Sequence, residues 1–200
     1  YNTFMIMKKI PLFLFLLIGL IGSAHSELRS CYGSNTSMYD NCYGKKTFKR
    51  SHPNWPGATY LGEWKNGKPD GKGTATFPTG EKYVGDLKDG KSHGRGVFTE
   101  PNLKSRWVDG IPPAIEYDGE WLNDQRSGRG TGIWADGSRW EGQWKNDAAQ
   151  GEGTFFHSGG DKYIGEVINF NNKIIIHGKG VIYWGPRAIR AGDMYFGEFL

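Results

Sequence analysis

The sequence contains little cysteine and no strong excess of one charge. Its 200 residues include two cysteines, Cys31 and Cys42, and 25 basic against 21 acidic residues. A structural zinc site takes about four Cys or His ligands, and neither cysteine has a Cys or His pair nearby at such a spacing. A nearly balanced charge gives no reason to expect a nucleic-acid partner. We therefore expect no metal site and no nucleic-acid interface.

Recognisable catalytic motifs are also missing. The chain has no Gly-x-Ser-x-Gly nucleophile elbow and no His-Glu-x-x-His zinc motif. A free cysteine nucleophile is not expected if the two cysteines oxidise. His93 and His177 stand at equivalent places before a repeated glycine, so repetition explains them. The sequence predicts a protein that is not an enzyme, with no catalytic residues and no cofactor.

One long apolar run occurs, at residues 10–21, after Lys8 and Lys9 and before Ala24-His25-Ser26. A basic start, an apolar stretch and a small-residue cleavage site are typical of a secretory signal. The run has about a dozen residues, whereas roughly 20 are needed to span a bilayer, so a permanent anchor is the weaker alternative. We expect a signal peptide over residues 1–26, cleaved after Ser26. The protein would then be exported, to the periplasm or cell envelope in a bacterium and otherwise to the extracellular space.

Export changes how the remaining residues are interpreted. The 25 basic residues less Lys8 and Lys9 leave 23 against 21 acidic residues, a net charge of +2. Two cysteines in an exported protein form a disulfide by default. A bond between Cys31 and Cys42 would close a loop of about a dozen residues and contribute about 3 kcal/mol. We expect residues 27–59 to form an N-terminal cap that contains this disulfide. The Met7-Lys-Lys-Ile start is typical of bacteria.

Glycine and aromatic residues are abundant, and they recur in a fixed phrase from Tyr60 onward. The phrase is an aromatic residue, any residue, Gly, an acidic residue, and an aromatic or aliphatic residue, with Gly-x-Gly seven residues later. It starts at Tyr60, Tyr83, Tyr117, Trp140, Tyr163 and Tyr195, mostly 23 residues apart. The repeat glycines are Gly62, Gly71, Gly73, Gly85, Gly94, Gly96, Gly119, Gly128, Gly130, Gly142, Gly151, Gly153, Gly165, Gly178 and Gly180. Such a short period is typical of arrays in which each unit contacts only its neighbours.

Each unit has the pattern of a β-hairpin. Tyr60, Gly62 and Trp64 alternate with more polar positions, which indicates a half-buried strand. Asn66-Gly67 is a turn signal, and the β-favouring run Thr74-Ala-Thr76-Phe77 follows it. A single hairpin is marginally stable in water, so stacking must bury the rings. The chain is therefore predicted to be all-β, an elongated, twisted antiparallel array of stacked hairpins with no helix after the signal peptide.

Residues 60–82, Tyr-x-Gly-Glu-Trp-x-Asn-Gly-Lys-x-x-Gly-x-Gly and the positions after it, resemble the MORN (membrane occupation and recognition nexus) repeat almost position for position. The resemblance extends over residues 60–200, as five full repeats and the start of a sixth that suggests a truncated chain. Half a repeat at residues 44–48 precedes them. The resemblance implies an aromatic-lined groove that serves as an interaction surface for proteins or, in some members of the family, for acidic lipids. A choline-binding cell-wall repeat is the alternative fold, but it would show paired Trp-Tyr-Tyr clusters.

The resemblance implies a protein partner held by the groove, and an anionic membrane lipid as the alternative. The candidate groove aromatics, each of which also has a purely structural role to fill by stacking, are Tyr60, Trp64, Tyr83, Tyr117, Trp121, Trp140, Trp144 and Tyr163. Extra residues at 99–110 and 168–176 are expected to be loops, where specific contacts are often made. For the lipid alternative the candidate basic residues recur around the turns, namely Lys68, Lys72, Lys91, Arg95, Arg126 and Arg129.

Two further patterns are better explained by the repeat. Residues 85–92 match the phosphate-loop pattern, but no helix is expected to follow them, so we expect no nucleotide. The acidic residue of the phrase recurs at Glu63, Asp86, Glu120, Glu166 and Glu198, and a solvated face or pairing with neighbouring basic residues is the simplest explanation. A third functional hypothesis is a regulatory repeat module of a longer enzyme, as in some phosphoinositide kinases. The export signal argues against it.

Overall fold

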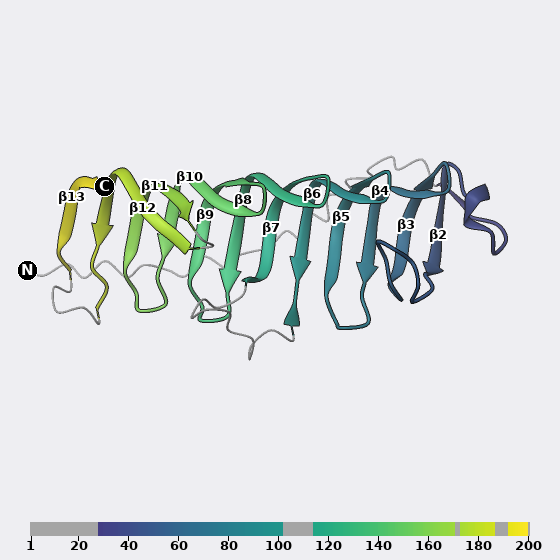
Figure 1. Ribbon diagram of the computed structural model, residues 1–200, viewed down its shortest axis with the longest axis horizontal. Helices are drawn as coiled ribbons and strands as arrows, with labels where there is room; N and C mark the ends of the chain where they lie inside the picture. The colour runs from purple at the N-terminus through teal and green to yellow at the C-terminus, as the bar shows by residue number, and fades with distance from the viewer. Residues whose placement is uncertain (1–27, 102–113, 171–172, 187–191, 200) are drawn as a thin grey trace, which may run out of the picture.

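The computed structural model describes residues 28–101, 114–170, 173–186 and 192–199. The predicted signal peptide and most of the extra segment at 99–110 lie outside these residues. The described chain forms one sheet in which every strand pairs with the next in sequence (Figure 1). The strands are β1 (Arg29–Ser30), β2 (Cys42–Thr47), β3 (Thr59–Lys65), β4 (Lys68–Thr76), β5 (Lys82–Lys88), β6 (Lys91–Thr99), β7 (Ala114–Leu122), β8 (Gln125–Trp134), β9 (Arg139–Lys145), β10 (Ala148–Phe156), β11 (Lys162–Phe170), β12 (Lys173–Tyr183) and β13 (Met194–Phe199).

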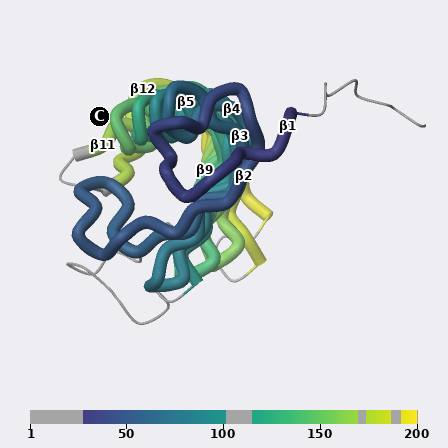
Figure 2. The backbone as a smooth tube through the Cα atoms, turned by 90° about the vertical axis from the view of Figure 1, so that its right-hand side faces the viewer, coloured from purple at the N-terminus to yellow at the C-terminus, as the bar shows by residue number. Residues whose placement is uncertain are grey.

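The predicted all-β array of hairpins is confirmed. Unit 1 is β3–β4, and units 2 to 5 follow as β5–β6, β7–β8, β9–β10 and β11–β12, all antiparallel. A short 3-10 helix, Thr36–Met38, precedes β2. Figure 2, a view along the array, shows the hairpins one behind another and curved in cross-section. The residues predicted to resemble a phosphate loop lie in the hairpin of unit 2.

Local sequence explains each hairpin. In β3, Tyr60, Gly62 and Trp64 are buried and Leu61 between them is exposed, so the strand has one face inward. We call the face with the buried rings the inner face and the opposite one the outer face. The turns take positive φ at both central residues, 48° at Asn66 and 75° at Gly67, and Asn and Gly tolerate this conformation best. Turn chemistry and alternation therefore fix the same register.

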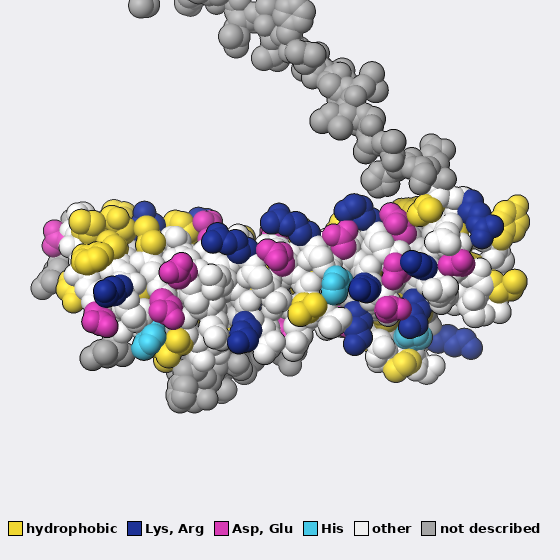
Figure 3. Space-filling view, turned by 90° about the horizontal axis from the view of Figure 1, so that it is seen from above, with side chains coloured by type: hydrophobic (Ala, Val, Ile, Leu, Met, Phe, Trp, Pro, Cys, Tyr) yellow, Lys and Arg dark blue, Asp and Glu magenta, His cyan; other side chains and the backbone are white. Residues whose placement is uncertain are grey.

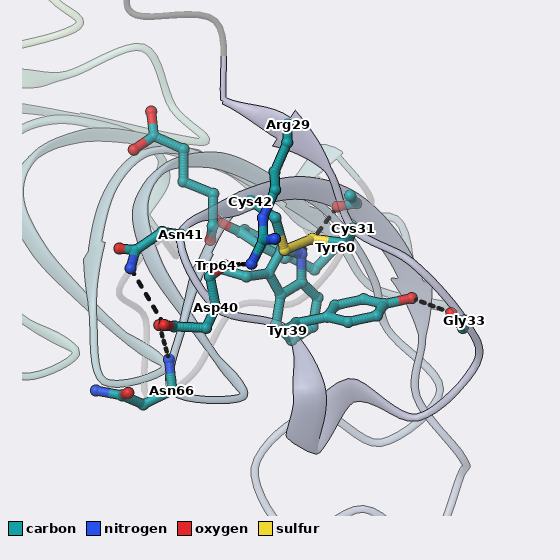
Figure 4. The surroundings of a disulfide bond; sticks show 12 residues. Arg29, Cys31, Gly33, Tyr39, Asp40, Asn41, Cys42, Tyr60, Trp64 and Asn66 are labelled. Carbon is teal, nitrogen blue, oxygen red and sulfur yellow. Dashed lines mark hydrogen bonds between the residues drawn. A yellow bond between two sulfur atoms is a disulfide. The ribbon is translucent and has the colours of Figure 1, made fainter.

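The cap closes the N-terminal end of the array. The predicted disulfide between Cys31 and Cys42 is present, with the two Cα atoms 5.0 Å apart (Figure 4). The ring of Tyr39 packs edge-on against Trp64 with centroids 5.1 Å apart, and Tyr39 Oη donates a hydrogen bond to the Gly33 carbonyl. The cap thus covers the ring of unit 1 that would otherwise face solvent.

The prediction of a second loop, at residues 168–176, is wrong. Residues 168–170 continue β11 and residues 173–176 continue β12, with Ile168 paired to Ile175 and Asn169 to Ile174. The reason is the composition of the extra residues, since β-branched isoleucines favour a strand over a loop. Unit 5 is therefore a longer hairpin than its neighbours.

Candidate functional site

The structure places most of the predicted groove aromatics inside the stack. Trp121 is half-buried, and the other seven are buried. The first aromatic of each unit hydrogen-bonds to the backbone carbonyl three residues later. These bonds run from Tyr60 to Glu63, Tyr83 to Asp86, Tyr117 to Glu120, Trp140 to Gln143 and Tyr163 to Glu166. This burial supports the stacking role of these rings, and their role in binding stays a prediction.

Two of the repeat glycines make room for that ring. Gly62 and Gly73 face each other across β3 and β4, and a Cβ on Gly73 would overlap the Tyr60 ring. The first glycine of the Gly-x-Gly has another reason. Gly71 has a φ of +101°, and a Cβ there would overlap the Glu63 side chain. The glycine pattern is therefore required by close approach and backbone conformation, whatever the array binds.

The second aromatic of a unit links it to the preceding unit. Trp144 Nε1 donates to the carbonyl of Gly130 at 3.0 Å, Trp121 to Gly96 at 2.9 Å and Trp64 to Gly44 at 3.0 Å. Units 2 and 5 have Leu87 and Val167 at this place, which have no donor. The two buried clusters of the array, one around Tyr60 and Trp64 and one around Trp140 and Trp144, are both built from these rings.

Burial also perturbs the tyrosine hydroxyls. It raises the pKa of Tyr60, Tyr83 and Tyr117 well above the ordinary value, with smaller electrostatic contributions from neighbouring charges. Burial raises the pKa of Tyr163 as well. These groups are therefore neutral hydrogen-bond donors at physiological pH.

The acidic residues of the phrase lie on the outer face, and two of them accept hydrogen bonds from the backbone. Asp86 Oδ2 accepts the N–H of Arg95 at 3.1 Å, and Glu120 Oε1 accepts that of Arg129 at 3.1 Å. Asp86 Oδ1 also accepts a hydrogen bond from Lys72 Nζ at 2.9 Å, an ion pair between neighbouring units. Burial alone would raise the pKa of Asp86, but the bonds from Lys72 and Arg95 hold it below its usual value. The same bond to Asp86 raises the pKa of Lys72.

Basic and acidic side chains are interspersed on the surface. Figure 3 shows one long face with both signs along the array and hydrophobic side chains gathered toward its two ends. Three of the basic residues named as lipid candidates form ion pairs, Lys68 with Asp89, Lys72 with Asp86 and Arg126 with Asp147. The described parts of the chain contain no group of Asp, Glu, His and Cys side chains that could hold a metal ion. None of the helices in those parts is long and apolar enough to cross a membrane.

A cavity of about 510 Å³ opens on the inner face between units 1 and 3. Its aromatic walls are Trp55 and Phe77 on one side, with ring centroids 6.0 Å apart, and Phe98 and Trp121 on the other, 6.3 Å apart. Tyr83 and Tyr117 also line it, and its charged lining residues are Glu100, Glu116, Asp124, Arg126 and Asp147. A second hollow of about 600 Å³ around Pro56 and Pro78 shares Phe77 and Phe98 with it. The two hollows thus meet at the same pair of rings.

Three of these wall residues were missed by the sequence analysis. Phe77 and Phe98 lie after the Gly-x-Gly and outside the repeated phrase, at two different positions of the unit. Their signal was the β-favouring run that follows the glycines. Trp55 comes from the segment before β3 and reaches unit 2, since its Nε1 donates to the Gly90 carbonyl at 3.2 Å. Of the predicted groove residues, the cavity brings together Tyr83, Tyr117 and Trp121.

The family model of the MORN repeat matches the chain at residues 60–82, 83–102, 117–139 and 140–162. The chain therefore carries four MORN repeats, which confirms the predicted resemblance over those residues. These matches correspond to units 1 to 4. The hairpin β11–β12 and strand β13 continue the same register, with Gly165 facing Gly180 and Gly180 facing Gly197. No curated protein matches the chain.

Proposed function

We propose that this array of MORN repeats is a non-enzymatic scaffold, exported to the cell envelope, that holds a protein partner on its inner face. The observation that carries the proposal is the ring-lined cavity and the hollow that adjoins it. Phe77, Phe98 and Trp121 remain half-buried after the array has stacked. Cavities of this size with aromatic walls and a few polar groups are typical binding sites, and aromatic side chains often supply most of the binding energy.

Rigidity supports the same function. Every unit is tied to the next by ladder hydrogen bonds, and neighbouring turns are joined by further bonds, such as Gly90 N–H to the Pro69 carbonyl at 2.8 Å. A surface that is already ordered loses little conformational entropy when a partner binds. Export is supported by the Cys31–Cys42 bond, because disulfides persist in oxidising compartments.

The test is site-specific photocrosslinking of the whole protein in a cell-envelope extract. A photoreactive phenylalanine analogue replaces Phe77 at the cavity wall, and in the matched control it replaces Leu61, which is 40% exposed on the outer face. We expect one protein to be crosslinked from position 77 and not from position 61. Crosslinking of the same protein from both positions, or from position 61 alone, would contradict binding on the inner face.

Vesicle binding decides between a protein partner and an anionic lipid. A protein-binding groove predicts no retention by phosphatidylserine vesicles beyond that by phosphatidylcholine vesicles. Retention that is strong at low salt and lost at high salt would assign the surface to lipid, because exposed charges are screened by salt.

A further inference from the structure

Arg126 occupies a site on the inner face in which a guanidinium group is held by rings and a carboxylate. Its Cζ lies 4.8 Å from the centroid of the Trp144 ring and 5.8 Å from that of Tyr117. Its Nε donates to Asp147 Oδ1 at 3.2 Å, and its Nη2 donates to the Asp147 carbonyl at 2.8 Å. Stacking on aromatic faces combined with forked hydrogen bonds is characteristic of arginine and is not reproduced by lysine.

The same framework exists one unit earlier. Trp121 faces Gly94 as Trp144 faces Gly128, and the Tyr83–Trp121 ring pair, at 5.4 Å, corresponds to the Tyr117–Trp144 pair at 5.0 Å. Backbone bonds at the two turns also correspond. Asp124 Oδ1 accepts the N–H of Ser92 at 2.7 Å, and Asp147 Oδ1 accepts that of Arg126 at 2.9 Å.

The two sites differ at one position, where unit 2 has Ser92 and unit 3 has Arg126. Trp121, Tyr83 and Asp124 are thus arranged as Trp144, Tyr117 and Asp147 are around Arg126. The serine side chain is too short to place a group over the ring faces as arginine does, and it hydrogen-bonds with the Tyr83 hydroxyl. Ser92, Trp121, Tyr83 and Asp124 all line the cavity of about 510 Å³. The cavity therefore contains the place that a guanidinium group fills in the next unit.

Charge on the cavity walls favours a cation. Among the described residues that line it, four are carboxylates, those of Glu100, Glu116, Asp124 and Asp147, and one is a cation, Arg126, which is bound to Asp147. The volume exceeds that of one guanidinium group, so the cavity also has room for the aliphatic part of the side chain and for apolar neighbours against Phe77 and Phe98.

We propose that this cavity binds the side chain of an arginine from the partner protein, with its guanidinium against Trp121 and Tyr83 and hydrogen-bonded to Asp124. This inference rests on the proposed function, since it names the chemistry of the partner at that groove. The internal Arg126 site supplies the geometry that the bound side chain repeats.

The probe is the peptide acetyl-Gly-Arg-Gly-amide, titrated into the whole protein while the indole N–H signal of Trp121 is followed by NMR. Two peptides serve as comparisons, one with citrulline, which has the same shape without the charge, and one with lysine. We expect a saturable shift with the arginine peptide and at least about tenfold weaker binding of both comparison peptides. Equal binding of the citrulline or lysine peptide would overturn the assignment to guanidinium.

Substitutions locate the site. Ser92→Arg places an internal guanidinium in the cavity and should abolish binding of the arginine peptide, whereas Gln150→Arg adds the same charge at an exposed position and should leave binding unchanged. Asp124→Asn keeps an oxygen acceptor for the Ser92 N–H and removes the charge, and should weaken binding about tenfold. An unchanged titration in the well-folded Ser92→Arg protein would overturn the proposal.

The outcomes separate this inference from the proposed function. If position 77 still crosslinks a partner but no arginine peptide binds, the groove function stands and the arginine assignment fails. If the peptide binds and no partner is crosslinked from position 77, the cavity recognises arginine but the scaffold function fails.

Discussion

The phenol of Tyr60 donates a hydrogen bond to the backbone carbonyl of Glu63 at 2.9 Å, and this bond turns the ring back over its own strand. The ring then covers Gly62 and the facing Gly73, where a Cβ would overlap it. The arrangement recurs in each unit, with Trp140 in place of tyrosine in unit 4. One ring and two facing glycines therefore lock every hairpin, which is the physical reason for the repeated phrase.

Gly73→Ala should lower the free energy of unfolding by about 2 kcal/mol, because the new methyl group displaces the Tyr60 ring and overpacking of this kind costs about 1–3 kcal/mol. Urea denaturation followed by tryptophan fluorescence measures the change. In a Tyr60→Leu background, Gly73→Ala should lower the free energy of unfolding much less, since the ring that the methyl group displaces is absent. An equal cost in both backgrounds would contradict the account.

A control separates crowding from backbone strain. Gly137 has a φ of +84°, and a Cβ at this residue would have no heavy atom beyond its chain neighbours within 4 Å. Gly137→Ala should therefore cost only the strain of a left-handed alanine, about 1 kcal/mol, and Tyr60→Leu should leave that cost unchanged.

The fold could be predicted from the sequence because several local signals agree. The ring and glycine spacing sets the period, alternation sets the face, and turn pairs such as Asn66-Gly67 set the hairpin register. Each unit contacts only its neighbours, so no long-range pairing had to be inferred. The segment 168–176 was mispredicted because its length suggested an insertion, although its β-branched isoleucines favour a strand.

The candidate site was less predictable. Seven of the eight predicted groove aromatics are buried by stacking, which a repeat pattern alone does not distinguish from exposure. The cavity depends on residues outside the repeated phrase, such as Phe98 and Trp55. The proposed guanidinium site was recognised from the difference between Ser92 and Arg126. That difference can be interpreted only when the surroundings of the two residues in units 2 and 3 are compared in the structure.

Glu152→Lys should stabilise the protein by about 0.5 kcal/mol. Glu152 directly faces Glu166 across β10 and β11, whereas at the equivalent places Lys72 faces Asp86 and Lys179 faces Glu198. The substitution replaces a like-charge pair by an opposite-charge pair. Thermal denaturation at low and high salt measures the effect, which salt should reduce. Glu152→Gln should give about half the gain, and a gain that is independent of salt would contradict the electrostatic cause.

Stability should fall as the pH rises above about 10, the ordinary pKa of tyrosine. Burial raises the pKa of Tyr60, Tyr83 and Tyr117 in the folded chain. Above pH 10 the unfolded state therefore binds fewer protons than the folded state, so the free energy of unfolding decreases with pH. Below pH 10 this contribution is fully present. Urea midpoints between neutral pH and about pH 11 measure the slope, which Tyr117→Phe should reduce. A midpoint constant over that range would contradict the raised pKa values.

Replacing Cys31 and Cys42 together by serine should lower stability by about 3 kcal/mol, and the loss should be concentrated at the N-terminal end. Each unit contacts only its neighbours, and the cap contacts unit 1 through the Tyr39–Trp64 ring pair and unit 2 through the Trp55 hydrogen bond to Gly90. Hydrogen exchange resolved along the chain measures the effect. Amide exchange should accelerate most in β2 and β3 and least in the distant strand β9, and reduction of the unaltered protein should reproduce this gradient. Uniform acceleration in all three strands would show that the array unfolds as one cooperative unit and would contradict a local role for the disulfide.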